Sequence, residues 1–147
     1  MAAQTDSPFS AITVLVVDDQ DYVRAIVSQL LKRLGIGRVI EAGNGSEAFK
    51  VLGRTTPDVI LCDIKMQPVD GLQFLHDVRK GLVGNDKNVP IIFLTSASDR
   101  ATVQAAIEGE VDGYLIKPVS AEELKTKIKA VLSRQPQEAG TSWRRSV

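Results

Sequence analysis

Near its N-terminus the chain reads Ile12-Thr13-Val14-Leu15-Val16-Val17-Asp18-Asp19. The first six of these residues are apolar or β-branched at consecutive positions, so a strand formed from them is apolar on both faces. Strands of this kind lie at the centre of parallel sheets that helices cover on both sides. The apolar stretch ends abruptly at two carboxylates. It therefore predicts a central strand with charge at its carboxyl end.

The same unit of strand followed by helix recurs along the chain. The predicted strands are 12–17, 38–42, 59–62, 91–94 and 114–116. Apolar residues at three- and four-residue spacing predict a helix after each strand. These helices are 23–34, one capped by Ser46, one after Gly71, 101–107, and one begun by the capping box of Ser120 and Glu123. The alternation predicts an α/β fold of the flavodoxin-like, doubly wound class, (βα)5, with a five-stranded parallel sheet in the order 2-1-3-4-5.

Length and composition restrict the classes of function. A chain of 147 residues fits one domain, which we place at 11–133 between an N-terminal tail, 1–10, and a disordered C-terminal tail, 134–147. Eighteen basic side chains balance eighteen acidic ones, which argues against direct binding of nucleic acid. No apolar run approaches the roughly 20 residues of a membrane span, and the start of the chain has no signal-peptide pattern. A cytoplasmic protein without a membrane contact is expected.

Polar residues stand where four of the five predicted strands end. They are the pair Asp18 and Asp19, then Asp63, Thr95 and Lys117. The carboxyl ends of parallel strands share one edge of the sheet, which is where ligands bind in such folds. Three acids gathered there need a cation, and ligands that are all oxygen favour Mg2+. A carboxylate, a hydroxyl and a lysine beside Mg2+ suit phosphoryl transfer to a carboxylate, which forms an acyl phosphate.

This set of motifs resembles the receiver domain of two-component response regulators. The resemblance covers about residues 11–133, nearly the whole chain. Each motif is weak alone, but their order and their positions at strand ends are specific. The residues that carry it are Asp18-Asp19, Asp63, Met66, Asp70-Gly71, Thr95-Ser96-Ala97, Tyr114 and Lys117-Pro118.

The resemblance implies a role for each acidic position. Asp63 matches the phosphoacceptor, which takes a phosphoryl group from the phosphohistidine of a sensor histidine kinase or a phosphotransfer protein. Asp19 matches a direct Mg2+ ligand, and Asp18 matches its water-bridged neighbour. Asp63 itself and the backbone carbonyl of Lys65 match the remaining protein ligands.

The resemblance also implies how a signal leaves the domain. Thr95 matches a hydroxyl that moves onto a phosphoryl oxygen, and Lys117 matches an ammonium that contacts another. Tyr114 matches an aromatic switch that turns inward when Thr95 moves, and the Lys117-Pro118 peptide is expected to be cis. The implied protein acts alone, either as a chemotaxis-type regulator of a downstream protein target or as an intermediate in a phosphorelay. It is not an enzyme in the ordinary sense, since it catalyses only its own phosphorylation and dephosphorylation.

Three places depart from the family pattern. The usual Met-Pro is Met66-Gln67-Pro68 here, so the proline comes one residue late. The usual Gly-Ala before the last strand is Glu110-Val111, with Gly109 one residue early. Lys65 occupies a position that more often holds a small or amide residue.

Two other hypotheses fit part of the sequence. Asp19-Gln20-Asp21-Tyr22-Val23 matches the Asp-x-Asp-x-Val motif of haloacid-dehalogenase-type phosphatases, with Asp19 as nucleophile and Asp21 as acid and base. That family needs a second acidic pair, for which only Glu122 and Glu123 are candidates. The other hypothesis is an interaction module with a receiver fold that never carries phosphate, and the complete set of site residues argues against it.

Overall fold

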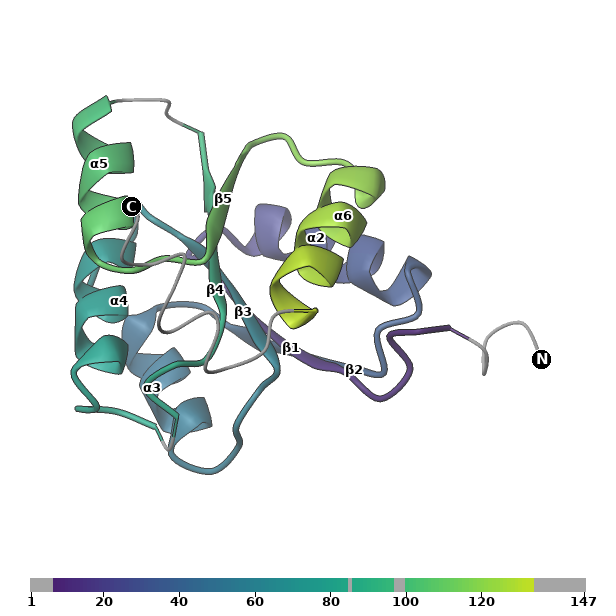
Figure 1. Ribbon diagram of the computed structural model, residues 1–147, viewed down its shortest axis with the longest axis horizontal. Helices are drawn as coiled ribbons and strands as arrows, with labels where there is room; N and C mark the ends of the chain where they lie inside the picture. The colour runs from purple at the N-terminus through teal and green to yellow at the C-terminus, as the bar shows by residue number, and fades with distance from the viewer. Residues whose placement is uncertain (1–6, 85, 97–99, 134–147) are drawn as a thin grey trace.

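The computed structural model describes residues 7–84, 86–96 and 100–133, and its sheet has the predicted strand order (Figure 1). The parallel strands run in the order β2-β1-β3-β4-β5, so the flavodoxin-like prediction is confirmed. The predicted tail 134–147 lies outside the described residues. The strands are β1 (Thr13–Val17), β2 (Arg38–Ala42), β3 (Val59–Asp63), β4 (Ile91–Thr95) and β5 (Gly113–Ile116).

Helices cover both faces of this sheet. They are α2 (Asp21–Arg33), α3 (Gly45–Leu52), α4 (Gly71–Arg79), α5 (Arg100–Glu108) and α6 (Ala121–Leu132). Helices α3, α4 and α5 lie on one side of the sheet, and α2 and α6 lie on the other (Figure 1). Alternate residues of β1 enter the two cores, Leu15 and Val17 on the α3–α5 side and Val14 and Val16 on the α2–α6 side. Within the described part of the chain, no helix has the length and apolar character needed to cross a membrane.

Strand register brings the strand ends together. Val17 pairs with Cys62, Asp63 pairs with Leu94, and Thr95 pairs with Ile116. The residues at or just beyond these pairs are the polar ones that the sequence singles out. The sheet therefore places them along one edge.

The start of α3 differs from the prediction. Ser46 was expected to cap this helix, but the cap is Asn44, whose side chain accepts a hydrogen bond from the backbone N–H of Glu47 at 2.9 Å. Asn caps a helix at least as well as Ser, and here it comes two residues earlier. Glu47 in turn accepts from the N–H of Gly43 at 2.7 Å. The predicted capping box of Ser120 at α6 is confirmed.

The connection between α5 and β5 explains one departure from the family pattern. Gly109 lies against α4, because a Cβ there would stand 2.7 Å from Cδ2 of Leu75. Glu110 then takes a positive φ of 69°, a conformation that glycine adopts more readily. Arg79 holds this turn, since its Nε donates to the Glu110 carbonyl at 3.0 Å and its Nη2 pairs with the Asp112 carboxylate at 2.7 Å.

The packed part of the chain begins before the predicted boundary at residue 11. Phe9 is 3% exposed and joins the core on the α2–α6 side. Its carbonyl accepts hydrogen bonds from the N–H groups of Ile12 and Gly37 at 3.0 Å each. Ser7 donates its hydroxyl hydrogen to the Leu34 carbonyl at 3.1 Å. Residues 7–10 are thus an anchored segment, and no periodicity reveals it because a single buried ring makes the contact.

Phe9→Ala is expected to lower the free energy of unfolding by about 3 kcal/mol, since a buried aromatic side chain is removed from a packed core. Urea unfolding measures this loss. Leu82→Ala, at a side chain that is 66% exposed, is the matched control and should change stability little. Equal stabilities of wild type and Phe9→Ala would contradict the anchored segment.

Candidate functional site

Three carboxylates meet at the carboxyl edge of the sheet. Oxygen atoms of Asp18, Asp19 and Asp63 all lie within 4.8 Å of one another. Asp18 is 2% exposed and Asp63 is 7% exposed, whereas Asp19 is exposed to solvent. Two of the three acids are therefore largely removed from water, and the third remains accessible.

Lys117 is the cation that faces the two buried acids. Its Nζ lies 2.9 Å from Oδ2 of Asp18 and 3.4 Å from Oδ2 of Asp63. Its backbone N–H donates to the Thr95 carbonyl at 2.7 Å, which keeps the end of β5 beside the end of β4. The Lys117-Pro118 peptide is cis, as expected. One ammonium among three carboxylates leaves the cluster with an excess of negative charge.

Asp18 is held at both carboxylate oxygens. Oδ1 accepts a hydrogen bond from the N–H of Gln20 at 2.9 Å, and Oδ2 accepts from Lys117. The backbone N–H of Asp18 donates to the Ala42 carbonyl at 3.1 Å, so the residue extends the pairing of β1 with β2. Hydrogen bonds to both the side chain and the backbone thereby hold Asp18 in place.

Burial raises the pKa of Asp63 above its ordinary value of 3.8, and the negative charge of Asp18 acts in the same direction. The charge and hydrogen bond of Lys117 lower the pKa, and so does the backbone N–H of Lys65. The raising effects are the larger, so this setting makes ionisation of Asp63 less favourable than it is in water. Any further cation next to it relieves the cost of the charge.

The donor set fits a hard divalent cation. Every side-chain ligand in the group is a carboxylate oxygen, and Mg2+ prefers oxygen ligands. Asp19 is exposed, so at least one carboxylate of the group is accessible to an ion from solvent. The predicted metal residues Asp18, Asp19 and Asp63 are thus brought together.

The loop from β3 to α4 packs tightly against the site. Gly71 is required here, because a Cβ would stand 2.5 Å from the Asp63 carbonyl oxygen. Its N–H donates to the Ile64 carbonyl at 2.7 Å, and Asp70 caps α4 by accepting from the Gln73 N–H at 2.9 Å. The predicted Asp70-Gly71 motif therefore has a structural reason.

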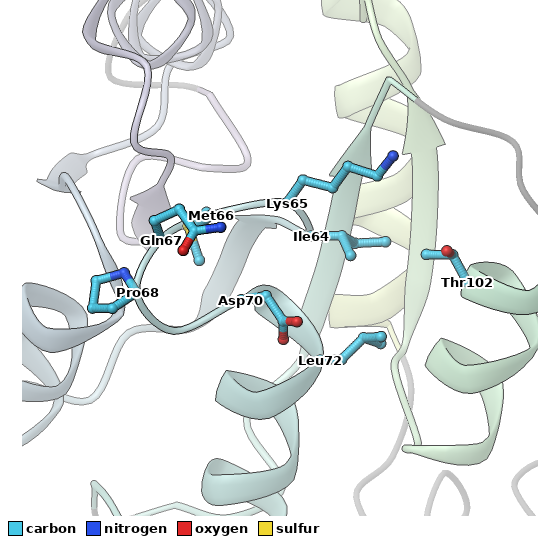
Figure 2. A pocket seen from close by; sticks show the side chains of 8 residues that line it. All are labelled: Ile64, Lys65, Met66, Gln67, Pro68, Asp70, Leu72 and Thr102. Carbon is cyan, nitrogen blue, oxygen red and sulfur yellow. The ribbon is translucent and has the colours of Figure 1, made fainter.

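The loop also borders an open cavity of about 420 Å³ on the α4–α5 side. Figure 2 shows Leu72 of α4 and Thr102 of α5 at opposite sides of it, with Lys65 extended from the loop. Lys65 is exposed and Met66 is buried. The Gln67-Pro68 peptide, where the family pattern shifts, is cis.

The two predicted switch residues lie on the same face of neighbouring strands. Thr95 is 1% exposed, and Tyr114 is 39% exposed. Tyr114 pairs with Phe93, two residues before Thr95, so both side chains project toward the α3–α5 side. Ala97, the last residue of the predicted motif after β4, lies outside the described residues.

The family model of the response regulator receiver domain matches residues 14–129. The chain belongs to the receiver domain family. This excludes the phosphatase hypothesis, and the geometry agrees: Asp21 forms an ion pair with Arg24 at 2.7 Å and is not among the gathered carboxylates.

Relatives of two sizes share this receiver domain. A probable chemotaxis protein CheY of Rhizobium etli is 36% identical over 120 residues, which are 82% of this chain and 92% of that protein. A probable transcriptional regulator ycf27 of Guillardia theta is 37% identical over 129 residues, which are 88% of this chain and 48% of the relative, so the chain spans about half its length. The solved structure of Vibrio cholerae CheY4 superposes with a TM-score of 0.75 at 31% identity, covering 82% of this chain and 98% of that one.

Sequence reasoning overlooked Arg24 beside the receiver site. Its Nη1 donates to the Asp18 carbonyl at 2.6 Å. The available signal was its position on the first turns of the helix that follows Asp18-Asp19. A lone arginine on an amphipathic helix does not stand out from other surface cations, so spacing alone could not single it out.

Asp63→Asn is expected to raise the free energy of unfolding of the metal-free receiver domain at pH 7. Because folding raises the pKa of Asp63, the folded state binds this proton more tightly than the unfolded chain does. The resulting stabilisation is fully present below pH 3.8 and is lost as the pH rises through the higher folded pKa. Asparagine carries no charge and escapes that loss.

Urea unfolding at pH 7 and near pH 3 measures the difference, which should shrink at the lower pH. Glu122→Gln removes an exposed carboxylate from the first turn of α6 and is the matched control. A less stable Asp63→Asn protein at pH 7 would contradict the charge balance described for the cluster.

Proposed function

We propose that this protein is a response regulator whose receiver domain accepts a phosphoryl group on Asp63 from the phosphohistidine of a sensor histidine kinase or a phosphotransfer protein in the cytoplasm. The observation that carries the proposal is the position of Asp63. Its carboxylate is gathered with the acidic pair at the sheet edge, with the Lys117 ammonium 3.4 Å from its Oδ2, in a chain of the receiver family.

Four groups would hold the Mg2+ ion. They are the carboxylates of Asp19, Asp18 and Asp63 and the backbone carbonyl of Lys65, with Asp18 acting through a bound water. When bound, the ion neutralises negative charge on the phosphoryl oxygens and on the acids around them. Support comes from the gathered oxygen atoms and from the excess negative charge that Lys117 leaves uncompensated.

The chemistry needs little movement of the protein groups. An Asp63 carboxylate oxygen attacks phosphorus, the bond between phosphorus and the donor's histidine nitrogen breaks, and the electron pair returns to that nitrogen. Lys117 already lies between two carboxylates, so its ammonium can move from Asp18 to a phosphoryl oxygen. Water that attacks the acyl phosphate later reverses the state, and the protein catalyses no other reaction.

We further propose that Thr95 and Tyr114 carry the signal. The Thr95 hydroxyl would move onto a phosphoryl oxygen, and the exposed Tyr114 ring would turn into the space left on the same face of the sheet. Helix α5, strand β5 and helix α6 would then present a changed surface to a downstream protein. The similarity to a probable chemotaxis protein of Rhizobium etli supports a role in signalling.

Incubation with a small-molecule phosphodonor and Mg2+ is expected to add the mass of one phosphate to the intact protein. Asp63→Asn should add none, because the attacking oxygen is lost. Asp58→Asn changes an exposed acid just before β3 and should be phosphorylated like the wild type. A phosphate that persists in Asp63→Asn but not in Asp19→Asn would refute the assignment of Asp63.

Phosphorylation is expected to bury the Tyr114 ring. The chain has two tyrosines, and the other, Tyr22, is 77% exposed on α2. In protein labelled with fluorotyrosine, a soluble paramagnetic agent should broaden both resonances before phosphorylation. Afterwards the Tyr114 resonance should be protected and that of Tyr22 should stay accessible. The Thr95→Ala protein should still be phosphorylated, but its Tyr114 ring should stay accessible. Unchanged broadening of the Tyr114 resonance in phosphorylated wild type would contradict the switch.

A further inference from the structure

Arg24 lies beside the acid cluster, and no step of the proposed chemistry uses it. It belongs to the first turns of α2, and its side chain is 16% exposed. The guanidinium makes three polar contacts. Nη1 donates to the backbone carbonyl of Asp18 at 2.6 Å, Nε donates to Oε1 of Glu41 at 3.1 Å, and Nη2 donates to Oδ1 of Asp21 at 2.7 Å.

The contact with Asp18 falls on the peptide that joins the two site acids. The register of β1 and β2 ends with the pair Val17 and Ala42. The N–H of Asp18 still donates to the Ala42 carbonyl, but the Asp18 carbonyl lies beyond the last pair. Because a peptide is planar, the direction of this carbonyl sets the direction in which the chain reaches Asp19. Arg24 therefore donates a hydrogen bond to the Asp18 carbonyl at the point where the pairing of β1 with β2 ends.

The arginine is itself held in place. Glu41 on β2 and Asp21 at the start of α2 accept hydrogen bonds from two edges of its guanidinium. The third hydrogen bond goes to the backbone carbonyl of Asp18. The guanidinium is a planar fork with fixed donor directions, whereas a lysine ammonium is a single point of charge on a flexible stem. The three contacts together need an arginine.

We propose that Arg24 is a positioning residue for the cation site: it fixes the Asp18–Asp19 peptide so that the exposed Asp19 carboxylate is presented beside Asp18 and Asp63. This inference rests on the proposed Mg2+-dependent function. Groups that orient the ligands of a metal commonly change its affinity about 10- to 100-fold when they are removed.

The sign of the effect separates positioning from plain electrostatics. A cation near an acidic site opposes the binding of Mg2+, so loss of the Arg24 charge alone would tighten binding or leave it unchanged. Loss of a positioning contact weakens binding. The two mechanisms therefore predict opposite changes for the same substitution.

Calorimetric titration of Mg2+ into unphosphorylated protein tests the inference. Arg24→Met keeps the aliphatic stem and removes every donor, and it should weaken Mg2+ binding by about 10-fold or more. Arg24→Lys keeps the charge without the fork, and it should also weaken binding. Glu41→Gln is the matched control: it removes the charge of this partner, but its amide oxygen can still accept the Nε hydrogen bond, so Arg24 stays in place and binding should change by less than about 3-fold. Circular dichroism identifies the variants that are folded, and Arg24→Lys carries the test if Arg24→Met does not fold.

The changes in Mg2+ affinity distinguish positioning by Arg24 from the alternatives. Weaker binding in the Arg24 variants with near wild-type binding in Glu41→Gln supports positioning. Wild-type or tighter binding in the Arg24 variants would overturn it, as would an equal loss in Glu41→Gln, which would tie affinity to the ion pair between α2 and β2. A wild-type protein that binds no Mg2+ would instead contradict the proposed function, so the two failures are distinct.

Discussion

The contact of Lys117 with Asp18 and Asp63 is the interaction around which the functional edge of this protein is organised. It joins the ends of β1, β3 and β5, which come from distant parts of the chain, through one ammonium at 2.9 and 3.4 Å from two buried carboxylates. Carboxylates this close repel one another, and burial increases the cost of their charge. The lysine reduces the repulsion between the carboxylates but does not balance their total charge. The remaining negative charge favours the binding of a further cation.

The three acids of the cluster have different roles because their surroundings differ. Asp18 has both oxygens engaged and is a fixed support. Asp19 is exposed and available to an incoming ion. Asp63 is buried, with a raised pKa, so a neighbouring cation lowers the cost of its charge. The residue proposed to react is thus also one whose charge lowers the stability of the fold, and perturbed pKa values of this kind are common at functional sites.

The sequence was sufficient for the fold and for most of the acid cluster. Strand order follows from alternating periodicities, and polar residues at strand ends meet wherever parallel strands share an edge. It was insufficient where a single side chain makes the decisive contact. Phe9 anchors a segment without a periodic pattern, Asn44 displaced Ser46 as a cap, and Arg24 contacts a backbone carbonyl, which no spacing of residue types reveals. The assigned roles in phosphoryl transfer and switching remain predictions.

Locating a bound ion in a crystal would show whether this cluster is a cation site. Crystals grown with Mn2+, an ion that also prefers carboxylate oxygens, would be measured near its absorption edge. We expect one strong anomalous peak at coordination distance from carboxylate oxygens of Asp19 and Asp63, with Lys117 outside the coordination sphere. An empty cluster at saturating Mn2+, or a peak only at acids elsewhere on the surface, would contradict it.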